Sequence, residues 1–159
     1  GILLAIVVVT ILGPGLRHAM IAVGIVAVPQ YARVMRAEVL RVKVQEYVAA
    51  ARALGATDWR ILRRAVLPNC LAPLLVQATL GMGTAILETA GLSYLGLGDD
   101  PSVPEWGSMI GQQFGHLRRA WWTVVPPLAG ISLVVLAFNL LGDGLRDVLD
   151  PRLRPTRES

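Results

Sequence analysis

Apolar residues fall into four stretches along the chain, and basic residues gather between and after them. The stretches cover approximately residues 1–13, 19–35, 69–92 and 120–142. The last two are about as long as the roughly 20 residues that a helix needs to cross a bilayer. Because unpaired backbone groups in lipid are costly, a stretch that crosses the bilayer must be helical. The pattern therefore predicts four membrane helices.

The first stretch is too short to cross a bilayer alone. Ile2 to Leu12 is apolar apart from Thr10, and the chain opens with Gly1 directly inside this run. We therefore expect that the chain begins inside a longer protein. Composition agrees with a membrane protein, because 54% of the residues are hydrophobic and only 16% are charged, against about 25% charged in soluble domains. The predicted fold class is an all-α, polytopic helical membrane bundle, truncated at its N-terminus.

Basic residues indicate the side of the membrane on which each connection lies. Residues 36–68 are rich in arginine, and the positive-inside tendency places such a segment in the cytoplasm. The tail, residues 143–159, is also basic and is separated from that segment by two predicted spans, so it falls on the same side. Residues 93–119 then form an outer loop. Arg118 and Arg119 in this loop count against the orientation but do not overturn it.

Charge and motifs exclude several classes of function. The net charge is +4, but no aromatic-studded basic patch or zinc spacing points to nucleic acid. No phosphate-cradling Gly-x-x-x-x-Gly-Lys motif and no catalytic constellation occurs. Cys70 has no second cysteine to pair with, and His18 and His116 are interpreted as surface residues. We therefore predict a non-enzyme that binds no cofactor, metal or nucleic acid itself.

The stretch from Glu46 to Pro68 reads as helix, tight turn, helix and then span. Its first part is rich in alanine, which has a high helix propensity. Gly55 is a natural helix stop, because glycine adopts positive φ without steric cost. Thr57 or Asp58 can then cap a second helix.

This helix pair has the surface of a docking element. Its alanines would let another protein approach closely, and Leu54, Trp59 and Leu62 can supply apolar anchors. The residues alone leave a second interpretation equally open, in which a plain amphipathic hairpin lies on anionic lipid.

The spacing in this stretch resembles the EAA loop of permease subunits in ABC-type importers. Ala50-Ala51, Gly55, Ala65 and Leu67-Pro68 stand at the positions of that signature, whereas Ala49 stands where it has glutamate. The resemblance implies that the loop is a coupling helix seated in a cleft of an ATPase subunit. The residues it assigns to ATPase coupling are Ala50, Ala51, Leu54, Gly55, Ala56, Asp58, Trp59, Leu67 and Pro68.

Longer strings are similar to the dipeptide, oligopeptide and nickel branch of these permeases, and to the second of its two permease subunits. They are residues 91–98, 106–109, 137–147 and 149–154. The resemblance implies the C-terminal portion of a multi-pass protein of the bacterial inner membrane that carries peptides or nickel. It also implies four kinds of partner: a second permease subunit, two ATPase subunits that bind ATP and Mg, an extracytoplasmic solute-binding protein, and the lipid bilayer.

Two further features outside the loop are candidates for function. Glu88 is an ionisable residue in the third apolar stretch and could line the pathway; the alternative is that it reaches interfacial water or caps a neighbouring helix. Gly107, Gly111 and Gly115 are spaced for close helix packing. We interpret them as part of a short interfacial helix packed on the bundle, with a contact to the partner permease as the alternative.

Two alternatives to the peptide importer stay open at the level of sequence. One is a membrane scaffold without transport activity, whose basic hairpin binds lipid. The other is a permease for a different cargo, which the longer strings disfavour. The first alternative predicts that no ATPase subunit binds the protein.

Overall fold

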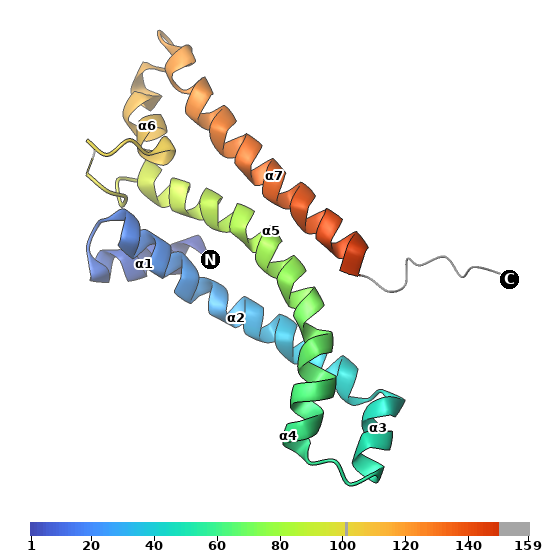
Figure 1. Cartoon of the computed structure of the whole chain (residues 1–159). Coiled ribbons are helices and arrows are strands. Elements are labelled where there is room, and N and C mark those ends of the chain that lie inside the picture. The colour runs from blue at the N-terminus through green and yellow to red at the C-terminus, as the bar shows by residue number, and fades with distance from the viewer. Residues whose placement is uncertain (101, 150–159) are drawn as a thin grey trace, which may run out of the picture. The chain divides into compact units, whose positions relative to one another are not determined.

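Helices form all the regular structure that the computed structural model describes, which covers residues 1–100 and 102–149 (Figure 1). The long helices are α1 (Ile2–Leu12), α2 (Leu16–Lys43), α5 (Leu67–Tyr94) and α7 (Val125–Leu149). The short ones are α3 (Glu46–Ala53), α4 (Asp58–Ile61) and α6 (Trp106–Gln113), with a π-helical turn at Leu62–Val66 and 3-10 turns at Phe114–His116 and Trp121–Thr123.

The helices suit a membrane rather than water. Three of them, counting continuous helical segments among the described residues, are long and apolar enough to cross a bilayer: Leu16–Lys43, Asp58–Tyr94 and Trp121–Leu149. The helix α1 is apolar but shorter. Leucines along α7 stay exposed, among them Leu133, Leu136 and Leu140. The fold is therefore an all-α polytopic membrane fold.

Helix ends differ from the predicted span ends at several places. The helix α2 continues past residue 35 to Lys43, and α7 starts at Val125 and continues to Leu149, into the segment predicted as a tail. Charged residues end the apolar core of a span, but they do not end a helix, because arginine and lysine are good helix formers. Within the predicted loop 93–119 the chain forms α6. The remainder of the predicted tail, residues 150–159, lies outside the described residues.

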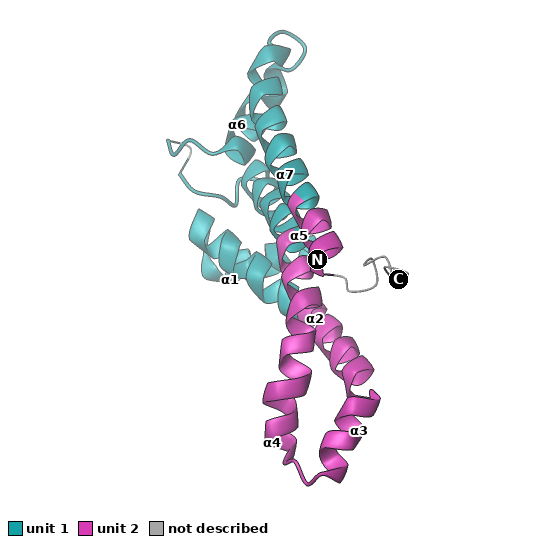
Figure 2. Ribbon diagram, turned by 45° about the vertical axis from the view of Figure 1, so that its right-hand side comes forward, with its two compact units in different colours: residues 1–28, 80–140 teal, residues 29–79, 141–159 magenta. Residues whose placement is uncertain are grey.

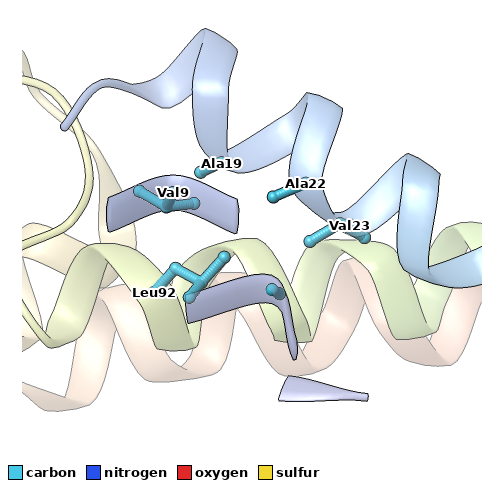
Figure 3. Close-up of a cluster of buried hydrophobic side chains, with 6 residues drawn as sticks. Val9, Ala19, Ala22, Val23 and Leu92 are labelled. Atoms are coloured by element: carbon cyan, nitrogen blue, oxygen red, sulfur yellow. The ribbon is translucent and has the colours of Figure 1, made fainter. Parts of the chain in front are cut away.

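One compact unit consists of residues 1–28 and 80–140 (Figure 2). Its buried cluster joins Val9 of α1, Ala19, Ala22 and Val23 of α2, and Leu92 of α5 (Figure 3). The alanines allow α1 and α2 to pack closely as an antiparallel pair. The turn between these helices is tied to the segment after α5, because the backbone N–H of Gly15 donates to the carbonyl of Leu97 at 3.3 Å.

The second unit covers residues 29–79 and 141–149 of the described chain (Figure 2). The short helices α3 and α4 lie side by side in it and connect the end of α2 to the start of α5 (Figure 1). Its buried cluster comprises Val42, Val48, Ile61, Val66 and Cys70. This cluster takes side chains from every helix around the connection, so the α3–α4 hairpin (residues 46–61) is packed onto the long helices.

A π-helical turn at Leu62–Val66 joins α4 to α5 without a break. It is closed by the backbone N–H of Leu67, which donates to the carbonyl of Leu62. Pro68 follows at once, and proline lacks an N–H and crowds the carbonyl four residues earlier. The wider turn accommodates Pro68 and keeps the hairpin and the long helix in one continuous segment.

Candidate functional site

The turn between α3 and α4 has the backbone pattern of a Schellman motif. Gly55 has φ +80°. Its N–H donates to the carbonyl of Arg52 at 3.0 Å, and the N–H of Ala56 donates to that of Ala51 at 3.1 Å. These two bonds satisfy carbonyls that the end of α3 would otherwise leave free. Gly55 thus ends the helix as its sequence position predicts, and any other residue there would be strained.

The second helix of the hairpin starts at a side-chain cap. The hydroxyl of Thr57 accepts a hydrogen bond from the N–H of Arg60 at 3.4 Å. Of the two capping candidates, Thr57 therefore takes this position, and Asp58 is the first residue of α4. The carboxylate of Asp58 instead accepts from the Arg52 guanidinium at 3.3 Å, with both side chains largely exposed. Such an exposed ion pair adds little stability.

The residues predicted for coupling divide into an exposed set and a packed set. At the tip, Leu54 is 88% exposed and Trp59 is 70% exposed. The exposed members of the set are Ala50, Leu54, Gly55, Asp58, Trp59, Leu67 and Pro68. Ala51 and Ala56 instead pack on the buried cluster of the second unit. The hairpin therefore presents a smooth alanine face beside two large apolar side chains, and the other face joins it to the chain.

Several residues that anchor the hairpin are not apparent from the loop motif. Asn69 in α5 donates from its amide nitrogen to the hydroxyl of Tyr47 in α3 at 3.2 Å and to the carbonyl of Ala65 at 2.6 Å. Val48 and Ile61 are buried between the helices, at 1% and 5% exposure. The sequence does not single them out, because Val48 stands beside Ala49 and Ile61 stands beside Leu62, which are also apolar. Together these contacts hold the hairpin against the start of α5.

The predicted small-residue positions lie mainly at the contact between α5 and α6. A Cβ on Gly107 would overlap the carbonyl oxygen of Ala90, and one on Gly111 would lie 2.8 Å from the carbonyl oxygen of Tyr94. The two helices therefore approach backbone to backbone. Gly115 does not share this contact, because α6 has ended at Gln113 and a Cβ on Gly115 would meet nothing within 4 Å.

Glu88 is half-buried in α5 and lies beside Gly1, the residue that precedes α1. A Cβ on Gly1 would lie 3.1 Å from the Oε1 atom of Glu88. The carboxylate therefore faces a neighbouring helix in the described chain. Its role in a pathway stays a prediction.

Comparison with known families decides the assignment of the chain. Residues 1–155 match the family described as "Binding-protein-dependent transport system inner membrane component". The chain belongs to this family. The resemblance inferred from the loop spacing and the longer strings is thereby confirmed.

Relatives of this transport family are similar over almost the whole chain. The dipeptide transport system permease protein DppC of Alkalihalophilus pseudofirmus is 51% identical over 153 residues, which are 96% of this chain and 50% of that protein. The di/tripeptide transport system permease protein DppC of Pseudomonas aeruginosa has the same identity and coverage. The glutathione transport system permease protein GsiD of Escherichia coli is 46% identical over 97% of the chain and 51% of its own length. The chain spans about half the length of these relatives.

Proposed function

We propose that this chain belongs to a permease subunit of an ATP-driven importer and forms part of the translocation pathway for peptides. The α3–α4 hairpin is the surface that binds an ATPase subunit. A second permease subunit, two ATPase subunits that bind ATP and Mg, and an extracytoplasmic solute-binding protein complete the transporter. Family membership and the transport functions of the relatives support this assignment.

The observation that carries the proposal is the two-sided construction of the hairpin. Its exposed side has small residues flanked by Leu54 and Trp59, which suits insertion of the tip into a cleft. Its inner side is packed through Val48, Ile61 and Val66 on helices that continue into the membrane. A movement of the ATPase subunit at the tip is therefore passed to α5 as a displacement of a rigid segment. The π-turn leaves no flexible linker between them.

The proposed orientation places this hairpin in the cytoplasm. The arginines Arg60, Arg63 and Arg64 are all exposed on or beside it, which follows the positive-inside tendency. The α5–α6 contact then lies on the outer side. The basic tail lies mostly outside the described residues, so the orientation rests on the hairpin.

Peptides are the proposed class of cargo. The relatives named above are permeases for dipeptides, di- and tripeptides, and glutathione, which is itself a small peptide. Nickel remains the alternative cargo within the same branch. Peptide cargo would be supported if unlabelled dipeptide, but not nickel, reduced the uptake of a labelled dipeptide.

The test is affinity purification of the full-length parent protein from membranes, scored for ATPase chains that co-purify. We expect an ATPase subunit with the parent and its loss with Gly55→Arg, because the substitution strains the turn and places a large charge at the tip. The matched control is Gly115→Arg, a glycine with equally open surroundings outside the hairpin.

Each outcome of this purification is informative. Loss of the ATPase with both variants would assign the effect to general misfolding. Recovery of the ATPase with Gly55→Arg would remove the hairpin from the interface. Absence of any ATPase from the parent would favour the alternative of a lipid-binding scaffold.

A further inference from the structure

A short hydrogen bond joins the end of α5 to the start of α6. The Ser93 hydroxyl, in the last turn of α5, donates to Oε1 of Glu105. Ser93 is only 3% exposed. Glu105 is the N-cap residue of α6, yet its side chain makes no capping bond to that helix. Its carboxylate bonds to α5 instead of capping α6, the helix that Glu105 precedes.

Gly98, which follows the end of α5, lies directly against this bond. A Cβ on Gly98 would lie 2.5 Å from Oγ of Ser93 and 3.0 Å from Oε2 of Glu105. Oε2 itself is buried and has no hydrogen-bond partner among the described residues. A buried polar atom without a partner costs stability, and such a group in a native structure calls for an explanation. Folding alone would be served better by an apolar pair at these positions.

The bond sets the position of α6 relative to two other helices. Directly after Glu105, the Trp106 ring packs on α7, where a Cβ on Gly130 would lie 3.0 Å from it. Gly107, the next residue, and Gly111, about one turn further on, touch the backbone of α5. At the far end, Phe114 packs edge-on against Tyr94 with ring centroids 5.8 Å apart. A shift at Glu105 would therefore misplace the whole of α6 between α5 and α7.

We infer that Ser93 and Glu105, covered by Gly98, form a latch that holds α6 on α5, and that Glu105 is a positioning residue for transport. The inference rests on the proposed function, since the outer ends of these helices border the translocation pathway only in a permease. With the latch closed, α5, α6 and the start of α7 move as one piece when α5 is displaced. With the latch open, the displacement of α5 no longer reaches α6.

The test uses the full-length parent assembled with its partner chains in liposomes, measuring peptide uptake and ATP hydrolysis together. Ser93→Ala and Glu105→Ala each remove one side of the bond. We expect each to lower, by roughly tenfold, the ratio of molecules with α6 held on α5 to molecules with α6 released. Uptake should then fall severalfold while ATP hydrolysis continues. Glu105→Gln keeps an oxygen that accepts from Ser93, so its uptake should stay close to the parent's.

Two controls separate the latch from general damage. Ser108→Ala removes a serine hydroxyl whose one hydrogen bond among the described residues goes to the Glu105 carbonyl within the same turn, and uptake should not change. The double variant Ser93→Ala with Glu105→Ala should be no worse than the worse single variant, both in uptake and in melting temperature, because one shared bond is lost. Equal loss of uptake and ATP hydrolysis, or additive losses in the double variant, would overturn the latch.

The same experiment distinguishes failure of the latch from failure of the proposed function. If the parent complex shows no ATP-dependent peptide uptake, the proposed function fails, and the melting-temperature cycle still reports whether the two residues are coupled. If the parent transports and Ser93→Ala matches it, only the latch is wrong. If Glu105→Gln is as poor as Glu105→Ala, the charge of Glu105 matters and its role as a hydrogen-bonded positioning residue is excluded.

Discussion

The chain reverses direction after α3 and after α5 with the same backbone motif, but the two turns have different roles. After α3, Gly55 has φ +80°, and after α5, Gly96 has φ +81°. In both, the glycine N–H and the next N–H return to carbonyls of the last turn. At Gly55 the chain leaves an exposed tip. At Gly96 it folds back, and α6 covers the end of α5. The same helix ending thus leads to the proposed docking surface at Gly55 and to the closed α5–α6 contact at Gly96.

The two turns differ in the side chains that flank each glycine. The α3–α4 hairpin places Leu54 and Trp59 outward, where the described residues leave them largely uncovered. The α5–α6 turn places Ser93 and Glu105 inward, where the Ser93 hydroxyl donates to the Glu105 carboxylate. Substitutions should therefore have different effects in the two regions. Changes at the α5–α6 contact should disturb packing, and changes at the tip of the hairpin should disturb binding.

The largest expected effect is a loss of stability at the α5–α6 contact. Gly107→Val should displace α6, because the added atoms overlap the backbone of Ala90. Overpacking of this kind costs about 1–3 kcal/mol or more, and backbone atoms cannot move aside as a flexible side chain would. The melting temperature and yield of the purified full-length protein should fall. Gly115→Val is the matched control and should leave both unchanged; similar losses in the two would refute the close α5–α6 contact.

An intermediate effect is expected at the tip, and on binding alone. Trp59 is 70% exposed, so Trp59→Ala should change stability by no more than about 0.5 kcal/mol. If the tip inserts into a partner cleft, truncating a tryptophan anchor should weaken that association by about 2 kcal/mol or more. Titration of the ATPase subunit onto reconstituted protein measures this. Unchanged affinity together with an unchanged melting temperature would show that Trp59 is not an anchor.

The smallest effect concerns the ion pair across the same turn. Arg52→Gln removes the bond to Asp58, whose side chain is 90% exposed. Because water and salt screen such a pair, the melting temperature should not change measurably. A clear loss of stability would mean that the pair, rather than the Gly55 turn and the buried cluster, holds the hairpin closed.

Much of the hairpin could be predicted from sequence because its determinants are local. Glycine at a helix end, threonine before the next helix and alanine within the first are signals that act over a few residues. The helix α2 extends beyond the apolar stretch from which a membrane span was predicted. The end of the apolar pattern marks where a span leaves the lipid, and the helix itself continues to Lys43.

The contacts that give these elements their roles were not predictable. Asn69 and Tyr47 are 22 positions apart, and Ser93 and Glu105 are 12 apart. Nothing in the pattern around either pair indicates that its members meet. Likewise the glycine spacing predicted three equivalent positions, but only Gly107 and Gly111 reach α5, because α6 ends before Gly115.

The sequence by itself determined that this is an all-α membrane protein, where its main helices lie, and which family it belongs to. Those features follow from apolar runs that must be helical in lipid and from motifs that are contiguous along the chain. Only the tertiary structure decided which side of the hairpin is free and which residues lock α6 to α5. Burial and hydrogen bonding between distant segments depend on how the helices pack, and the sequence of a single helix does not determine that packing.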